Sequence, residues 1–462
     1  MTAAQVLTAA QMRSAEQALF DAGAGASELM EIAAGGAAEW VRRIAAGRSV
    51  TVLCGPGNNG GDGYVIARCL RAAGNPVTVI APFPPKTAAA HEARRRWNGP
   101  VTTAGANGGE VFVDCLFGSG LSRPLIAEHA VLLRELAARH RYTVAIDLTS
   151  GVASDSGAVL NEGLPAYDLT LALGAWKFAH WSLPGRALMG QLRLVPIGIC
   201  EVAGAAQVIQ RPHLSSPGVD SHKYRRGLLA IVAGAMPGAS LMSAAAAQRS
   251  GAGYVKLFAR QADPRTPVEV GTDTSPLTEA LADRRIAAVL IGPGLGRDEA
   301  ARVMLEETLL RAPALVLDAD ALILLTPAML GRDMPLLATP HDGELGALCD
   351  NFGIIATARR DRALALAKVS GMVVLAKGPD SLVAAPDGRL ALGMPSPSWL
   401  SVAGSGDVLA GIAASRMATG VDPFTAACEA VWLHGEAARL AGPAFTPSQL
   451  AERVSEALAA CL

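Results

Sequence analysis

Short apolar runs alternate with helical stretches along this chain of 462 residues, and they do so in two separate series. In the first series the strand candidates are residues 50–54, 77–80, 111–115, 144–146 and 169–173. In the second they are residues 228–232, 254–258, 288–291, 315–317, 336–338, 373–375 and 382–385. Strands that alternate with helices predict βαβ units and a mostly parallel sheet. The chain is also too long for one ordinary core, so we expect two α/β domains.

The alternation stops between Val202 and Arg226, where two prolines and clustered serines occur without any periodicity. Such a stretch is typical of a linker. We therefore predict a first domain at residues 1–204, a linker at 205–226 and a second domain at 227–462.

The composition excludes several classes of function. The net charge is −1, with no basic excess, so we expect no nucleic-acid partner. No uncharged apolar run approaches the roughly 18 residues that span a bilayer, and we expect no membrane contact. The first 20 residues lack the pattern of a signal peptide. Seven scattered cysteines without a C-x-x-C pair predict reduced thiols and a cytoplasmic location.

A glycine-rich loop, GPGNNGGDG at residues 55–63, follows the first strand candidate and matches G-x-G-x-x-G. A dinucleotide-binding oxidoreductase would also need an acidic residue about 20 positions later, at the end of the next strand. That strand ends VTVIAPFPP, so an oxidoreductase is disfavoured. Asn58, Asn59 and Asp62 add more polarity than a tight turn requires, although a tight turn is the simpler alternative. Backbone amides at a helix start bind anions, and the amide oxygens can ligate a cation.

Two more predicted strands end in an aspartate that precedes a glycine-rich turn. Asp114 is followed by residues 118–124, and Asp147 is followed by Ser150. A single aspartate at such a place is often only a helix cap. Because ligands bind outside the carboxyl ends of parallel strands, we expect the three loops to meet at one pocket.

The stretches GPGNNGGDGYVIAR, DCLFGSGLSRP and IDLTSGVASDSG together resemble the motifs of NAD(P)H-hydrate epimerases, over roughly residues 8–200. The resemblance implies a Rossmann-like domain with αβα layers, and a potassium ion at Asn59, Asp114 and Ser150. It also implies that Asp147 contacts the hydrated ring, where we expect it to transfer the proton. The implied substrate contacts are Asn58, Asn59, Gly60, Gly61, Asp62, Gly118, Ser119, Gly120, Leu121, Ser122, Arg123, Pro124 and Asp147. Thr149 departs from the family, which usually has proline there.

In the second series, residues 404–407 read GSGD before an Ala/Leu-rich helix. Small residues at a helix start leave amides free for a phosphate, and Asp407 could take a proton from a hydroxyl that is being phosphorylated. A capping role for Asp407 is the alternative. Further strand ends carry GPGLG, DADAL, TPHDGE and KG, and no P-loop motif occurs.

This ordered set resembles the ADP-dependent NAD(P)H-hydrate dehydratases, which have a ribokinase-like αβα fold, over roughly residues 215–462. The resemblance implies substrate contacts at Ala239, Gly296, His341 and Asp407, with Asp407 as the catalytic base. It implies adenine-nucleotide contacts at Lys377, Gly378, Pro379, Asp380, Ser381 and Gly406. The early loop VAGAMPGAS lacks the usual serine, and SVA stands before GSGD where the family more often has ATG.

Both regions in one chain, the epimerase first, look like the bacterial bifunctional repair enzymes. The implied activity is epimerisation of hydrated NADH and NADPH, then dehydration of the S form with ADP and Mg²⁺, releasing AMP and phosphate. We expect a homo-oligomer. One alternative is a true small-molecule kinase fused to a nucleotide-binding regulatory domain. Another makes the N-terminal half a ligand-sensing module.

Overall fold

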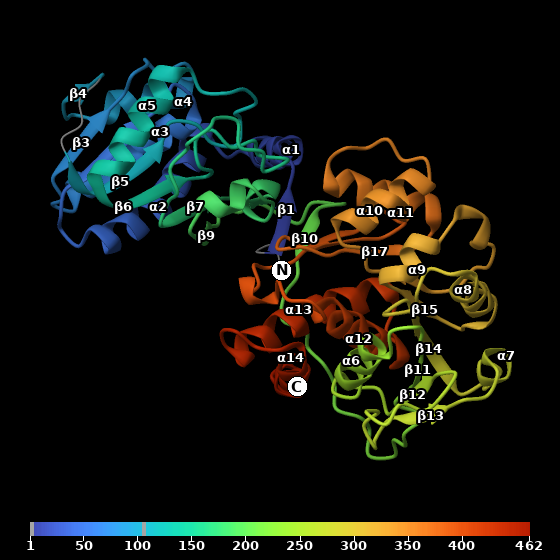
Figure 1. Ribbon diagram of the computed structural model, residues 1–462. Helices are drawn as coiled ribbons and strands as arrows, with labels where there is room; N and C mark the ends of the chain where they lie inside the picture. The colour runs from blue at the N-terminus through green and yellow to red at the C-terminus, as the bar shows by residue number, and fades with distance from the viewer. Residues whose placement is uncertain (1–3, 104–107) are drawn as a thin grey trace. The chain divides into compact units, whose positions relative to one another are not determined.

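The computed structural model describes residues 4–103 and 108–462. The chain divides into two units, Met1–Ala206 and Gln207–Leu462, which run from blue to green and from green to red in Figure 1. The domain limits drawn from the motifs stay a prediction. A short strand, β10 (Ala206–Val208), lies inside the stretch that the sequence predicts as a linker.

A sheet of seven parallel strands forms the centre of the N-terminal unit, in the order β4-β3-β2-β5-β6-β7-β9. In that order the strands are Val101–Thr102, Val77–Ile80, Val50–Cys54, Gly109–Cys115, His140–Ile146, Leu169–Leu173 and Gln191–Val195. In the same unit, β1 (Gln5–Leu7) pairs in parallel with β8 (Trp176–Lys177).

Helices cover both faces of this sheet (Figure 1). On one face lie α1 (Ala9–Asp21), α2 (Ala26–Ala45), α3 (Asn58–Ala72) and α4 (Ala88–Arg96). On the other lies α5 (Ala127–Arg139). Alternate strand residues serve the two faces: Val52 packs with the first group, and Leu53 packs with α5. Strands buried on both sides need continuous apolar runs, which is why β2, β5, β6 and β7 were recognisable in the sequence. The edge strands β4 and β9 are less buried and were not predicted.

The sheet of the C-terminal unit is parallel over its first seven strands, in the order β13-β12-β11-β14-β15-β16-β17. These are Gly271–Asp273, Tyr254–Phe258, Leu228–Val232, Ile286–Ile291, Leu315–Leu317, Leu336–Ala338 and Val373–Ala376. Two antiparallel strands follow, β18 (Leu382–Ala384) and β19 (Leu390–Leu392), and β10 pairs with β19.

Four helices pack on one face of this sheet and make its largest core: α6 (Pro237–Ala247), α12 (Ser405–Ala418), α13 (Pro423–Ala441) and α14 (Pro447–Ala459). The remaining helices are α7 (Leu277–Ala280), α8 (Glu299–Arg311), α9 (Ala319–Leu324), α10 (Asp342–Asn351) and α11 (Arg359–Ser370). Among these, α8 to α11 lie on the side of the sheet opposite the first four (Figure 1).

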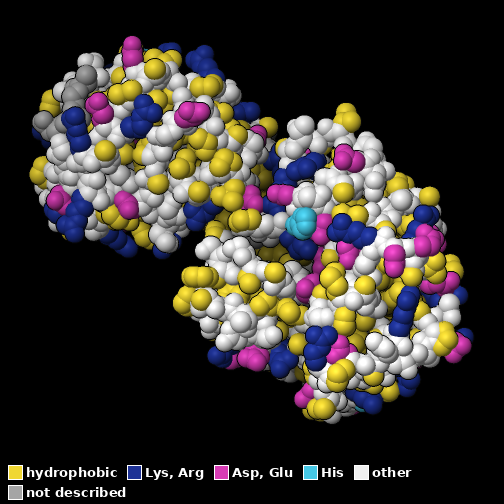
Figure 2. All heavy atoms as spheres, viewed as in Figure 1, with side chains coloured by type: hydrophobic (Ala, Val, Ile, Leu, Met, Phe, Trp, Pro, Cys, Tyr) yellow, Lys and Arg dark blue, Asp and Glu magenta, His cyan; other side chains and the backbone are white. Residues whose placement is uncertain are grey.

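The α/β class with layered helices and mostly parallel sheets is therefore confirmed. Acidic and basic side chains are interspersed on the visible face of each unit in Figure 2. No helix in residues 4–103 and 108–462 combines the length and apolarity needed to cross a bilayer.

Candidate active sites

A pocket of about 420 Å³ opens at the carboxyl edge of the N-terminal sheet. Strands β2, β5, β6 and β7 are neighbours there, so the loops that follow them converge. Predicted site residues that line the pocket are Asn58, Asn59, Asp62, Gly118, Ser119, Gly120, Leu121 and Asp147. Those that do not line it are Gly60, Gly61, Asp114, Ser122, Arg123, Pro124 and Ser150.

Gly60 and Gly61 serve the packing of the loop. A Cβ atom on Gly60 would lie 1.8 Å from the carbonyl oxygen of Gly55, and one on Gly61 would lie 2.6 Å from Cε of Met30. Only glycine permits α3 to begin this close to the end of β2. The two glycines thus place Asn59 and Asp62 at the pocket without lining it themselves.

Asp147 lines the pocket, and three contacts fix its position. Lys177 Nζ donates to its Oδ1 at 2.5 Å, and the Ser119 amide donates to its Oδ2 at 2.9 Å. His180 Nε2 lies 2.8 Å from its carbonyl oxygen. The backbone of Asp147 has φ 67°, a conformation that costs energy for a residue other than glycine and recurs at functional sites. Burial acts to raise the pKa of the Asp147 carboxyl, but Lys177 and the Ser119 amide outweigh burial and lower it.

Lys177 and His180 were not predicted from the sequence. Lys177 is only 1% exposed, and its Nζ also donates to the carbonyl oxygen of Leu173 at 2.6 Å. Burial, reinforced by the Lys177 charge, lowers the pKa of His180 to about 4, so the ring is neutral. In that form Nε2 donates to Asp147 while Nδ1 accepts from the Lys177 amide at 2.9 Å. The sequence offered one signal for Lys177, because a lysine inside the apolar stretch that follows β7 needs a buried partner.

The residues implied for potassium present oxygen donors. The Asp114 carboxylate is fully buried and accepts from Ser150 Oγ at 2.8 Å and from Tyr167 Oη at 2.7 Å. The amide oxygen and nitrogen of Asn59, and the hydroxyl of Thr149, are buried without hydrogen-bond partners. Amide, hydroxyl and carboxylate oxygens suit a hard monovalent cation, so the donor set fits the implied ion.

In the C-terminal unit, charged groups gather at the carboxyl ends of β15 and β17. Lys377 Nζ lies 2.5 Å from Asp318 Oδ1 and 3.8 Å from Glu344 Oε2. Burial acts to lower the pKa of Lys377, but these carboxylates outweigh burial and raise it. A Cβ atom on Gly406 would lie 3.5 Å from Lys377 Nζ, so the start of α12 approaches the same group. Lys377 and Gly406, both predicted to contact the adenine nucleotide, are thus brought together.

Asp407 stands in the first turn of α12, after Gly404 with φ 96°. Its pKa is raised to about 6, chiefly by burial. The negative charge of Asp318 raises the pKa further, and this effect is larger than the lowering by Lys377. Ser243 Oγ on α6 lies 2.9 Å from the carbonyl oxygen of Asp407 and 3.2 Å from that of Ala239. Through Ser243, the predicted residues Ala239 and Asp407 therefore lie at one crossing of two helices.

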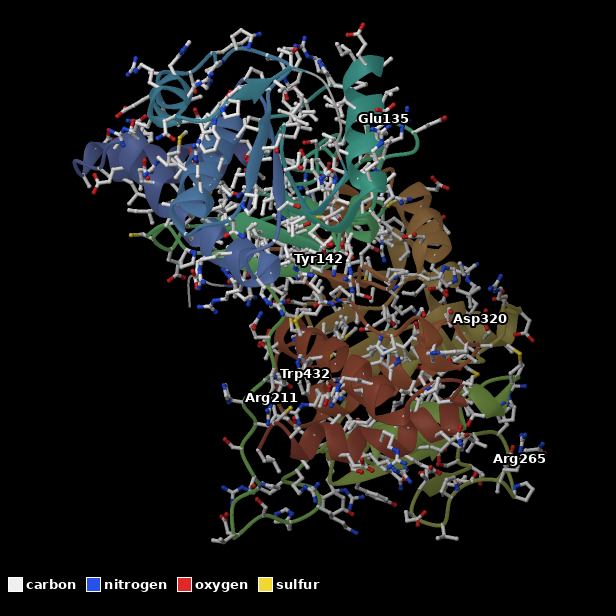
Figure 3. The ribbon with its side chains drawn as sticks, turned by 90° about the vertical axis from the view of Figure 1, so that its left-hand side faces the viewer. Glu135, Tyr142, Arg211, Arg265, Asp320 and Trp432 are labelled. Carbon is white, nitrogen blue, oxygen red and sulfur yellow. The ribbon has the colours of Figure 1, made fainter. Side chains whose placement is uncertain are left out.

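Other predicted residues flank this cluster. The Gly296 amide donates to Asp320 Oδ2 at 3.0 Å, and Asp320 is labelled in Figure 3. His341 is the N-cap residue of α10, where its Nδ1 accepts from the Gly343 amide at 3.0 Å, and its ring is largely exposed.

Residues 377–381 form the turn between β17 and β18. Arg359 holds this turn by donating to the backbone carbonyls of Asp380 and Ala376, both at 3.0 Å. Neither Arg359 nor Ser243 was predicted. Asp318 and Glu344 stood in quoted motifs but were given no role.

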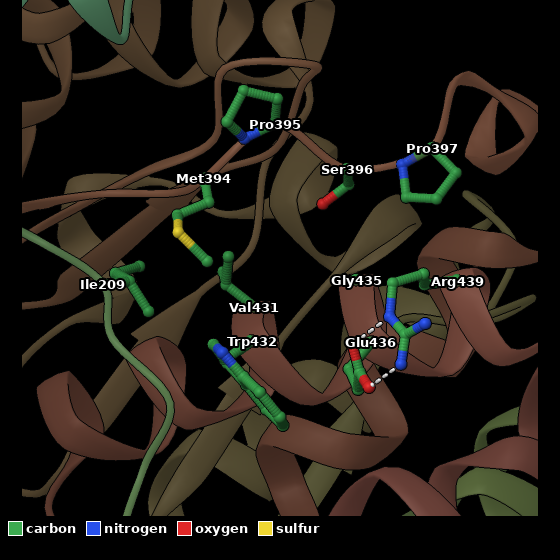
Figure 4. A pocket seen from close by; sticks show the side chains of 10 residues that line it. All are labelled: Ile209, Met394, Pro395, Ser396, Pro397, Val431, Trp432, Gly435, Glu436 and Arg439. Carbon is green, nitrogen blue, oxygen red and sulfur yellow. Dashed lines mark hydrogen bonds and ion pairs between the residues drawn. The ribbon is translucent and has the colours of Figure 1, made fainter. Parts of the chain in front are cut away.

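Two further cavities occur in the C-terminal unit, and neither is lined by a predicted site residue. One, of about 440 Å³, is shown in Figure 4. Met394, Val431 and Trp432 make much of its wall, and Arg439 pairs with Glu436 at its rim. The other, of about 480 Å³, lies beside the first turns of α6 and α8.

Family models match both units. The model described as the YjeF-related protein N-terminus matches residues 26–179, and that of the NAD(P)H-hydrate dehydratase matches residues 229–460. Two relatives are each named bifunctional NAD(P)H-hydrate repair enzyme. The one from Gloeobacter violaceus is 34% identical, over 95% of this chain and 93% of the relative. The one from Salinibacter ruber is 32% identical, over 96% and 93%.

Solved structures resemble the C-terminal unit. An ADP/ATP-dependent NAD(P)H-hydrate dehydratase from Bacillus subtilis, co-crystallised with ATP and Mg²⁺, is 26% identical and covers 54% of this chain and 95% of that chain, with a TM-score of 0.48. On the extent of the sequence matches, the chain belongs to the family of bifunctional NAD(P)H-hydrate repair enzymes, with an epimerase domain followed by a dehydratase domain.

Proposed function

We propose that this repair enzyme epimerises hydrated NADH and NADPH at the pocket around Asp147 and dehydrates the S epimer at the cluster around Asp407. The observation that carries the proposal is the presence, in one chain, of Asp147 held by Lys177 and of Asp407 in the first turn of α12, near the charges of Asp318 and Lys377. The substrate carries a hydroxyl on C6 of the nicotinamide ring, next to the ring nitrogen. Both reactions begin at this carbon.

For epimerisation, Asp147 is the proton-transfer residue at the C6 hydroxyl. Its carboxylate is ionised and oriented by Lys177 and the Ser119 amide, which supports its action as a base. Asn58 and residues 118–121 position the nucleotide, and such positioning supplies a large part of the rate.

Asn59, Asp114 and Ser150 would hold the potassium ion in the epimerase domain. When bound, that ion would supply positive charge that attracts the substrate phosphates. The unpartnered amide of Asn59 supports this assignment.

For dehydration, Asp407 accepts the proton of the C6 hydroxyl while that oxygen attacks the terminal phosphorus of ADP, and AMP departs. The C6–O bond then breaks with its electron pair going to phosphate, assisted by the lone pair of the ring nitrogen. Loss of a proton from C5 restores NADH or NADPH. Lys377 and the Gly406 amide, which lie close together, are proposed to stabilise the transferred phosphoryl group.

Residues 377–381 and Gly406 are proposed to bind the adenine nucleotide, with ADP as the phosphoryl donor and Mg²⁺ bound along with it. Within the described residues, no group of three or more His, Cys, Asp or Glu side chains is arranged to hold a metal ion. Carboxylates such as Glu344 and the nucleotide phosphates are the available oxygen donors. We further propose a cytoplasmic homo-oligomer. The seven cysteines are all free, which supports a reducing compartment.

The test uses the two epimers of hydrated NADH, supplied separately, and two variants of the full chain. Asp407→Ala is expected to abolish nucleotide-dependent loss of the S epimer while R and S still interconvert. Asp147→Asn is expected to leave the R epimer unconsumed while the S epimer is still repaired. Near-normal dehydration by the first variant, or equal consumption of both epimers by the second, would contradict the residue assignments. Accumulation of a stable phosphorylated product would instead indicate a small-molecule kinase.

A further inference from the structure

Three carboxylates line the N-terminal pocket, and the proposed epimerisation uses only one of them. Asp147 is bound to Lys177, and Asp62 and Glu16 also line the pocket. Asp62 lies in the second turn of α3 and is 7% exposed, so it is more than nine-tenths buried. Across residues 4–103 and 108–462, its carboxyl group has no hydrogen-bond or ion-pair partner. A buried carboxyl group that lines a pocket without a partner is costly unless it serves a ligand.

The surroundings of Asp62 and Asp147 differ in charge, because Asp147 is paired with the ammonium group of Lys177 and, in the described part of the chain, Asp62 is not paired with a cation. Lys177 also lines the pocket, and its ammonium group is already bound to Asp147 and to the carbonyl oxygen of Leu173. Burial, together with the nearby charges of Asp147 and Glu16, raises the pKa of Asp62 well above its usual value. The pKa of Asp147 is lowered. Two carboxyl groups in one pocket whose surroundings favour opposite protonation states form the arrangement of an acid–base pair.

We propose that Asp62 is the general acid of the epimerase, acting opposite the base Asp147 on the ring nitrogen of the hydrated nicotinamide. This inference rests on the proposed function of the pocket and assigns its second proton-transfer group.

The step balances as follows. Asp147 removes the proton of the C6 hydroxyl, and the oxygen's electron pair forms a C6 carbonyl. The bond between C6 and the ring nitrogen breaks, its electron pair goes to nitrogen, and Asp62 donates a proton there. The opened aldehyde turns about the C5–C6 bond, and nitrogen attacks the other face of the carbonyl. Asp62 recovers its proton from nitrogen, Asp147 returns its proton to oxygen, and the ring closes as the other epimer with no net consumption.

Charged groups face Asp62 from several elements, and they set the expected pH dependence. Asp147 follows β6, Lys177 lies on β8, and Glu16 and Arg13 lie on α1. Lys86 lies on the loop before α4. Because Asp62 must be protonated and Asp147 ionised, the epimerase rate should follow a bell-shaped pH profile. The fall of the rate at high pH, the basic limb of the profile, should report the loss of the proton from Asp62.

The test compares wild type with Asp62→Asn, which keeps the shape of the side chain but cannot supply a proton. Conversion of R to S is followed chromatographically as a function of pH. We expect kcat to fall about 100-fold or more, KM to change little, and the basic limb to disappear. A second variant, Asp62→Ala, should regain epimerisation on addition of formic acid, in proportion to the protonated acid. Dehydration of the S epimer by the C-terminal unit is the internal control for intact protein.

Several results would overturn the inference. A higher KM with unchanged kcat would make Asp62 a binding residue only, and an unchanged basic limb in Asp62→Asn would remove it from proton transfer. If the variants fail to fold, the wild-type profile still decides, because a rate that does not decline at high pH excludes a protonated acid. Failure of wild type to interconvert the epimers at all would instead refute the function proposed for the pocket.

Discussion

Replacing Asp407 with Asn should abolish dehydration and, at the same time, stabilise the C-terminal unit. Burial and the neighbouring carboxylates, Asp318 foremost, raise the pKa of Asp407 from 3.8 to about 6. The folded unit therefore binds this proton more tightly than the unfolded chain does. The ionised carboxylate opposes folding at pH values above about 6, and this opposition disappears as the pH falls from about 6 towards about 4. Asn does not ionise, so the substitution removes this destabilisation.

The expected size follows from the shift. About two pKa units correspond to about 3 kcal/mol between the two protonation states. The carboxyl group is partly open to solvent, and screening reduces this to about 1–2 kcal/mol. In a unit of this size, 1 kcal/mol moves the melting temperature by about 2–4 °C. Asp407→Asn should therefore melt about 2–8 °C higher than wild type at about pH 8, with little or no gain in melting temperature at about pH 4.

Scanning calorimetry of the full chain at both pH values measures this, and the dehydratase assay runs in parallel. Asp422→Asn is the matched control, because Asp422 also stands at a helix start but its pKa is lowered by hydrogen bonds from Thr425 that outweigh burial. Asp422→Asn should show no increase in melting temperature at either pH. An Asp407→Asn variant that melts at or below the wild-type temperature at about pH 8, or gains equally at both pH values, would refute the reasoning.

Three more predictions concern the charged groups of the two sites. Lys177→Met removes the cation that lowers the pKa of Asp147, so the acid limb of the epimerase pH profile should move to higher pH; an unmoved limb would contradict this. Replacing K⁺ by a bulky organic cation should depress epimerisation and spare dehydration of the S epimer, and Ser150→Ala should raise the K⁺ concentration for half-activation at least about tenfold. Activity of Ser150→Ala at the wild-type K⁺ concentration would exclude Ser150 as a ligand. Lys377→Met should raise the KM for ADP and shift the acid limb of dehydration upward, since Lys377 lowers the pKa of Asp407; steady-state rates against pH and ADP check both effects.

Much of the fold was predictable because both sheets are covered on two faces. Strands such as β2 and β11 are then continuous apolar runs, and the loops that follow them carry the polar residues. The convergence of Asn59, Asp62 and Asp147 at one pocket followed from the rule that parallel strands end at one edge. The strand β10 gave no such signal, because its three residues read AQV and are not a continuous apolar run.

The charged partners of the two aspartates were less predictable. Lys177 follows Asp147 by 30 residues, and their ion pair exists only because β7 lies beside β6. Lys377 meets Asp318 across 59 residues for the same kind of reason. A sequence pattern locates a strand end, but which cation reaches which carboxylate is decided by tertiary packing. For Gly60 and Gly61 the structure adds a packing requirement to the predicted substrate contacts, because a Cβ atom at either position would collide with neighbouring atoms.

The most direct test of the account is to incubate an equal mixture of the two epimers of hydrated NADH with the full chain, ADP, Mg²⁺ and K⁺. The absorbance of the reduced nicotinamide ring and the release of phosphate are followed together. The account predicts full recovery of NADH from both epimers, with one phosphate released for each NADH formed. Recovery that stops at the share of the S epimer would contradict the epimerase, and a phosphorylated product that persists would contradict the dehydratase.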